Sequence, residues 1–305
     1  MTRFFCFLIF SVILTLAACK KSEIITDPGT NPPATPGSGN NPSATNSRLS
    51  YGDTLFYNHS LPADKLVNTV SFPAGTVKYK AIPLGLSLDS ITGRINVTKS
   101  ESGVRYKVFA INNAGIVLDS VKLVISGVDY RDEIFVLQST PNAYDTSFPV
   151  YNARPGLALP CSGDDDDDDE SCVFDETDLD NDGNDDIAGI IQDKLLVDKQ
   201  TGTIDLEASF NAGIFGSSTP VNGTQKDFLM YYRLNDASNK ALQKINIRVY
   251  YFNRRSDIPQ TLLNELAQRS SQQSVINARA EYSFSNYSSF EKPKRPPILI
   301  IVNTL

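Results

Sequence analysis

A twelve-residue pattern occurs twice in the sequence, and this repeat limits the folds that the chain can adopt. The segments LSLDSITGRINV (residues 86–97) and LLVDKQTGTIDL (residues 195–206) share alternating apolar positions, an Asp and then Thr-Gly-x-Ile. Asp accepts backbone N–H groups in a turn and Gly permits a positive φ, so each copy predicts a tight hairpin. Two copies about 110 residues apart predict two β-sandwich domains, the second beginning near Val128.

The segments around both copies favour the same all-β fold class. They are short, rich in β-branched and aromatic residues and separated by turns, a spacing typical of sandwiches. Strands are predicted at 226–234 and 244–252, and the apolar end of the chain predicts a buried strand. Leucines at helical spacing after a Pro predict one short helix near the C-terminus, within residues 258–272.

Two segments of the first predicted domain carry a closer resemblance. GLSLDSITGRINV and SGVRYKVFAINNAGIVLDSVKLVIS (residues 85–97 and 102–126) resemble the Ig and cadherin-like modules of bacterial surface proteins. The resemblance implies an Ig/cadherin-like sandwich at 49–128 and, through the repeat, a second β-rich domain at 129–305 with an acidic insertion at 161–189. The positions that hold interdomain calcium in cadherins read LDSI and VDKQ here, without the Glu, so we do not expect calcium of that type.

The N-terminus has the pattern of an export signal. Arg3 precedes an apolar run at 4–14, and Leu-Ala-Ala-Cys follows at 16–19. The run is shorter than the roughly 20 residues that span a bilayer. The four residues resemble the lipobox of bacterial lipoproteins. The resemblance implies a signal peptide at 1–18, acylation of Cys19 with fatty acids such as palmitate, and anchoring to a bacterial membrane. Lys20, which follows the cysteine, favours the outer membrane or cell surface. The alternative is an ordinary secreted protein.

Residues 19–48 form the next predicted segment, a flexible linker. It is rich in Pro, Gly, Ser, Thr and Asn and poor in large apolar residues, so it cannot bury enough surface to fold. Beyond it two cysteines remain, Cys161 and Cys172. An even pair in an exported chain predicts a disulfide. The alternative, a thiolate metal site, lacks partners, since His59 is the chain's one histidine.

A large share of the negative charge of this chain lies in one segment. Of the 35 acidic residues, fourteen lie between residues 164 and 186, where there is no Lys or Arg. A clustered basic surface, which nucleic-acid binding requires, is not evident, so we expect no nucleic-acid partner. The run Asp164–Glu170 places like charges side by side, and adjacent side chains cannot all face one ion. It predicts a mobile, solvated loop.

A metal site is predicted just after this run. The segment DLDNDGNDD (residues 178–186) has alternate carboxylates followed by a Gly, and Ca²⁺ takes 6–8 oxygen ligands that a tight loop can supply. It resembles the Asp-x-Asp-x-Asp-Gly calcium loops of EF-hands and thrombospondin repeats, except that Gly189 stands where the EF-hand has its bidentate Glu. The alternative is a solvated turn. The predicted ligands are Asp178, Asp180, Asp182, Asn184 and Asp186, and the predicted cofactor is structural Ca²⁺.

Catalytic motifs are not evident in the sequence. A lone histidine is seldom a base, and no nucleophile elbow, paired zinc histidines or phosphate-binding Gly loop is present. We therefore expect a non-catalytic envelope lipoprotein that acts in surface adhesion or binds an extracellular glycan or protein ligand. The alternative is a polysaccharide-processing hydrolase or its sugar-binding accessory subunit. The tyrosines at 231, 232, 250 and 251 are expected to be strand residues split between core and surface rather than a sugar-binding face.

Overall fold

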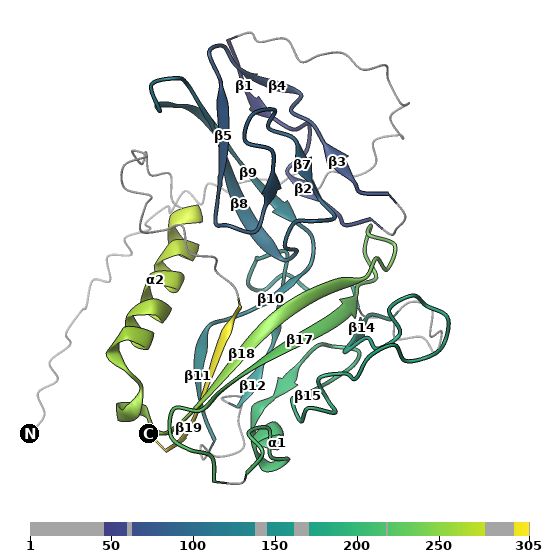
Figure 1. Ribbon diagram of the computed structural model, residues 1–305, viewed down its shortest axis with the longest axis vertical. Helices are drawn as coiled ribbons and strands as arrows, with labels where there is room; N and C mark the ends of the chain where they lie inside the picture. Colours follow the sequence, from purple (N-terminus) through teal and green to yellow (C-terminus); the bar gives the residue numbers. More distant parts are fainter. Residues whose placement is uncertain are drawn as a thin grey trace, which may run out of the picture. The chain divides into compact units, whose positions relative to one another are not determined.

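The computed structural model describes residues 46–59, 63–137, 145–161, 171–217, 219–277 and 296–304 (Figure 1). Within this part of the chain β-strands make up most of the regular structure, which confirms the all-β prediction. Residues 42–305 form one compact unit. The predicted signal peptide, Cys19, most of the linker and the run Asp164–Glu170 lie outside the described residues.

The first sandwich consists of two sheets that share one core. A four-stranded sheet has the order β2-β9-β8-β5 and a three-stranded sheet the order β3-β7-β6, while β1 pairs with β4. Buried residues of both sheets, among them Ile95, Tyr106 and Leu123, pack together between them. The strands are β1 (Asn46–Ser50), β2 (Leu55–Phe56), β3 (Leu66–Val67), β4 (Ser71–Pro73), β5 (Lys78–Ile82), β6 (Ser87–Leu88), β7 (Ile95–Asn96), β8 (Val104–Ile111) and β9 (Val117–Ile125).

The next nine strands repeat this topology in the same order. β10 pairs with β13, as β1 does with β4. β12-β16-β15 form a three-stranded sheet, which corresponds to β3-β7-β6. β14, β17 and β18 are neighbours in a larger sheet and correspond to β5, β8 and β9. These strands are β10 (Val128–Tyr130), β11 (Glu133–Val136), β12 (Thr146–Ser147), β13 (Pro149–Tyr151), β14 (Val173–Phe174), β15 (Leu196–Val197), β16 (Ile204–Asp205), β17 (Gln225–Arg233) and β18 (Gln243–Arg254). The two sandwiches are therefore copies of one plan.

The second copy differs from the first by one inserted strand. In the first sandwich β2 pairs directly and in parallel with β9, but in the second β19 (Ile298–Thr304) lies between β11 and β18 and is parallel to both. The larger sheet has the order β11-β19-β18-β17-β14. A parallel neighbour requires a crossover connection, and here the connection contains α2 (Gln260–Asn277).

Helix α2 covers one face of this sheet. Leu262 packs with Phe252 of β18 and Ile300 of β19, and Figure 1 shows the helix alongside these strands. On the opposite face, Val249 and Ile301 belong to the main core of the second sandwich, together with residues of α1 (Leu206–Asn211). β19 is therefore buried on both faces.

The helices differ in detail from the single short helix that the sequence predicts. α2 has 18 residues and α1 is a second, shorter helix, and a 3₁₀ turn at Arg255–Asp257 precedes α2. The reason for the length of α2 is local: no Gly or Pro occurs between residues 260 and 277, so no strong terminator interrupts it.

The repeated sequence pattern forms equivalent hairpins in the two copies. The carboxylate of Asp89 accepts the N–H groups of residues 91 and 92 at 2.9 Å each, and Asp198 accepts those of residues 200 and 201 at 3.0 and 2.7 Å. The backbone donors at residues 92 and 201 lower the pKa values of Asp89 and Asp198 respectively. The predicted Asp-Gly hairpin chemistry is confirmed at both sites.

The glycine of each hairpin also lies against an aromatic ring. A side chain at Gly93 (φ 73°) would meet the ring of Tyr79, and one at Gly202 (φ 69°) would meet that of Phe174. The Gly93 carbonyl accepts the hydroxyl of Tyr51 at 2.7 Å, and the Gly202 carbonyl accepts that of Tyr130 at 2.6 Å. The duplication therefore extends from topology to side-chain contacts.

Candidate metal site and the junction of the two sandwiches

The acidic loop begins directly after β14 and is closed at its base by a buried carboxylate. Asp175 is 3% exposed, and it accepts the N–H groups of Ile190 at 2.6 Å and Ile191 at 3.1 Å. A side chain at Gly189 would collide with the Asp175 carboxylate. A side chain at position 189 would therefore not fit without a shift of Asp175, so this position, where the EF-hand pattern has its Glu, cannot supply a ligand.

Three of the five predicted ligands converge. Asp178, Asp180 and Asp186 each offer a carboxylate oxygen, and these oxygens lie within 4.8 Å of one another. The side chain of Asp182 instead accepts the backbone N–H of Asn184 at 2.9 Å and its amide at 3.0 Å. The structure therefore places Asp182 and Asn184 in the turn beside the convergent group.

The electrostatics of the convergent carboxylates differ from one to the next. Desolvation opposes ionisation of Asp178, but the backbone N–H groups of Gly183, Asn181 and Asp182 outweigh it and lower the pKa of this carboxyl. The charge of Asp182, with desolvation and the charge of Asp186, raises the pKa of Asp180. Repulsion from neighbouring carboxylates therefore acts on Asp180, where a bound cation would relieve it.

The donor set fits a hard cation. All three convergent groups are carboxylates, and the described part of the loop has no sulfur or imidazole ligand. Ca²⁺ accepts flexible oxygen cages, whereas Mg²⁺ requires a near-ideal octahedron and Zn²⁺ prefers nitrogen and sulfur. An exposed loop of hydrogen-bonded turns matches the flexible cage. Asp178, Asp180 and Asp186 would hold the ion, with backbone carbonyls and water completing its coordination.

Arg233, at the end of β17, fixes the loop to the sheet. Its Nε lies 2.7 Å from the carboxylate of Glu176, and both side chains are largely buried. Its guanidinium also donates to the carbonyls of Asp178 and Leu179 at 3.1 Å each, while Glu176 accepts the Asp178 N–H at 3.1 Å. Sequence reasoning missed Arg233, because it lies more than 40 residues beyond the loop.

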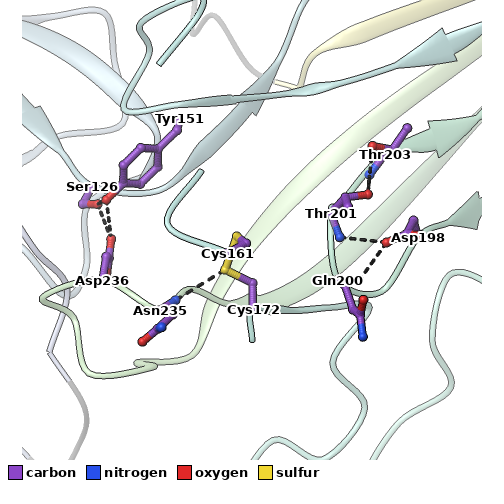
Figure 2. Close-up of a disulfide and its surroundings, with 10 residues drawn as sticks. All are labelled: Ser126, Tyr151, Cys161, Cys172, Asp198, Gln200, Thr201, Thr203, Asn235 and Asp236. Carbon is purple, nitrogen blue, oxygen red and sulfur yellow. Dashed lines mark hydrogen bonds between the residues drawn. A yellow bond between two sulfur atoms is a disulfide. The ribbon is translucent and has the colours of Figure 1, made fainter. Parts of the chain in front are cut away.

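The predicted disulfide between Cys161 and Cys172 is confirmed, with Cα atoms 4.9 Å apart (Figure 2). Cys172 is 2% exposed and its sulfur accepts the backbone N–H of Asn235 at 3.4 Å. The bridge therefore joins the two ends of the segment that contains the aspartate run and attaches them to the turn after β17.

Buried hydrogen bonds connect the first sandwich to the second. The hydroxyl of Tyr232, a residue with no exposed surface, lies 2.9 Å from that of Ser102 in the first sandwich. Within the second sandwich the same hydroxyl accepts the Val128 N–H at 3.1 Å. Nearby, Asp236 accepts the hydroxyls of Ser126 at 2.7 Å and Tyr151 at 2.9 Å (Figure 2). Residues from both copies also line a groove of about 530 Å³ at this junction.

The tyrosines divide between core and surface as predicted. Tyr232 and Tyr251 are buried in the core of the second sandwich, and Tyr231 and Tyr250 lie half-buried on the opposite face of the sheet.

His59, the residue weighed as a catalytic base, is exposed. Neither helix in the described residues combines the length and the apolar character that crossing a bilayer requires.

The sequence matches no protein-family model and no curated protein. Among solved structures, a similar chain is a SusE-like, surface-located polysaccharide-binding protein from the heparin utilisation locus of Bacteroides thetaiotaomicron, with 17% identity and a TM-score of 0.21. The match covers 66% of this chain and 33% of that one, so this chain matches about a third of the length of that protein. With so low a TM-score, the fold described here rests on the strand pairings alone.

Proposed function

We propose that this protein is a lipid-anchored protein of the bacterial cell surface that binds an extracellular ligand through its two sandwiches and does not transform it. The proposal rests on the structure of the junction between the two sandwiches. A groove there is lined by residues of both copies, and hydrogen bonds between Ser102 and Tyr232 and between Ser126 and Asp236 hold the copies together. Rigid positioning of two modules reduces the entropy lost on binding.

The groove favours binding over the alternative of polysaccharide hydrolysis. Glycosidases of the usual kind need two carboxyl groups facing each other across the cleft, roughly 5–9.5 Å apart. Among the residues that line this groove, Glu101 is the one that carries a carboxyl group. Adhesion through the same surface is compatible with this geometry, because it needs binding without chemistry.

Calcium binding by the acidic loop is the second part of the proposal, and it leads to a direct test. Asp180→Asn is expected to weaken Ca²⁺ binding by roughly tenfold or more, because it removes one of three convergent charges. Asp180 is the best residue to change, since its carboxylate accepts a single backbone N–H, that of Asp182 at 3.2 Å. Isothermal titration calorimetry of the full-length protein in detergent measures the affinity.

Two matched substitutions control this test. Asp193→Asn removes the same charge from an exposed residue outside the loop and is expected to leave the affinity unchanged. Asp182→Asn should have a smaller effect than Asp180→Asn, because Asp182 does not belong to the convergent group. Equal affinities for the wild-type and Asp180→Asn proteins would remove Asp180 from the site.

The lipid anchor is tested by Cys19→Ser. Lipoprotein acylation requires the thiol of Cys19, and more than one acyl chain is needed for stable anchoring. The variant is therefore expected to move from the membrane fraction to the soluble fraction of the cell envelope, as measured by fractionation and immunoblotting. Cys6→Ser, which lies in the predicted signal peptide, is the matched control. If Cys19→Ser stays with the membrane as wild type does, the anchor is not at this residue.

A further inference from the structure

The groove at the junction has walls of mixed polar character. Its volume of about 530 Å³ lies within the roughly 300–1,000 Å³ of typical small-molecule sites. The first sandwich contributes Asn58 and residues 98–102, and the second contributes Tyr231 and residues 242–246. We propose that this groove binds a short oligosaccharide, an inference that rests on the proposed surface-binding function and assigns its site and ligand class.

Gln243 is one of the lining residues, and its amide is buried. Gln243 is 3% exposed, and its Oε1 accepts the Tyr232 hydroxyl at 3.1 Å, which orients the amide. Its Nε2 has no hydrogen-bond partner among the described residues. A buried donor left unsatisfied is unfavourable by roughly 1–3 kcal/mol. Because Gln243 pairs with Tyr232 across β17 and β18, its side chain lies on the core side of the sheet, and the contacts available to a ligand come from the outer face.

Three further polar side chains at the groove are available to a ligand. Tyr231 and Lys244 are register partners on β17 and β18, and Asn246 lies on the same outer face two residues after Lys244. The structure gives none of these three side chains a hydrogen bond to another described residue. Together they present a phenol, an ammonium and an amide on the outer face of β17 and β18.

These groups match saccharide chemistry better than they match an apolar ligand or a metal ion. Each sugar hydroxyl both donates and accepts a hydrogen bond, and the C–H face of a sugar ring can pack against an aromatic ring such as that of Tyr231. An apolar ligand would desolvate the amides and the ammonium without replacing their hydrogen bonds. A metal ion would find one carboxyl group among the lining residues, that of Glu101, which is too few for a hard cation.

The test compares full-length proteins, purified in detergent, on a glycan microarray and then by calorimetry with the best saccharide. The triple variant Tyr231→Ala, Lys244→Met, Asn246→Ala is expected to bind at least about tenfold more weakly than wild type. Lys78→Met, an exposed strand lysine outside the groove, should bind like wild type. Unchanged melting temperatures would show that the variants are folded.

Each outcome bears on a different claim. Saccharide binding that the triple variant loses supports the groove as its site. Saccharide binding that the triple variant retains overturns the groove and leaves the proposed surface-binding function standing. If no saccharide on the array binds, the ligand class is wrong, and binding of the same protein to a peptide array then decides whether the broader function survives.

Discussion

Ile301→Asp is expected to unfold the second sandwich at 25 °C. Ile301 has no exposed surface and lies in the middle of β19, opposite Phe135 of β11 and Tyr251 of β18. An ionised carboxylate there would be buried without a partner, a loss of several kcal/mol. Domains of this kind are stable by only about 5–15 kcal/mol. Near-UV circular dichroism and limited proteolysis of the purified variant measure the loss of structure.

A graded series and a matched control make this result specific. Ile301→Val is expected to lower the free energy of unfolding by about 0.5–1.5 kcal/mol, and Ile301→Ala by about 2–5 kcal/mol. Ile116→Asp makes the same chemical change at a residue that is 60% exposed and should stay within about 0.5 kcal/mol of wild type. If Ile301→Asp and Ile116→Asp are equally stable in urea, β19 is not inserted in the sheet.

Insertion of β19 marks the limit of what the sequence predicts about the fold. The hairpins at Asp89 and Asp198 could be predicted because Asp, Thr and Gly act within a few residues of one another. The apolar segment at the end of the chain also indicates a buried strand. Its neighbours, however, are separated from it by helix α2 on one side and by most of the second sandwich on the other. Only the packed core selects such partners, since long-range pairing has no local signature.

The candidate sites also contain some residues that the sequence can predict and others that it cannot. Asp178, Asp180 and Asp186 could be found from spacing because they lie within nine residues of one another. The role of Gly189 could not, because it depends on contact with the Asp175 carboxylate. The groove combines residues 98–102 with Tyr231 and Gln243, which come from different copies of the repeat. The alternation of apolar and polar residues along a strand predicts which side chains are buried, but it does not predict that residues of the two copies meet at one groove.

Arg233→Met is expected to lower the free energy of unfolding by about 3–5 kcal/mol, because it leaves the Glu176 carboxylate buried without its ion pair. Both side chains of the pair are less than 15% exposed. The same change releases the carbonyls of Asp178 and Leu179 from the guanidinium, so the Ca²⁺ affinity of the loop should fall as well. Urea denaturation and calcium calorimetry measure the two effects.

Arg248→Met provides the control for this prediction in the same sheet. Arg248 contacts Asp227 through two hydrogen bonds of 2.7 and 2.8 Å, but the pair is considerably more exposed, and exposed pairs contribute about 1 kcal/mol or less. Adding Glu176→Gln to Arg233→Met should restore much of the stability, since the buried charge is then removed. It should not restore calcium binding, because the loop carbonyls stay unanchored; recovery of both together would show that Arg233 acts on the loop through Glu176 alone.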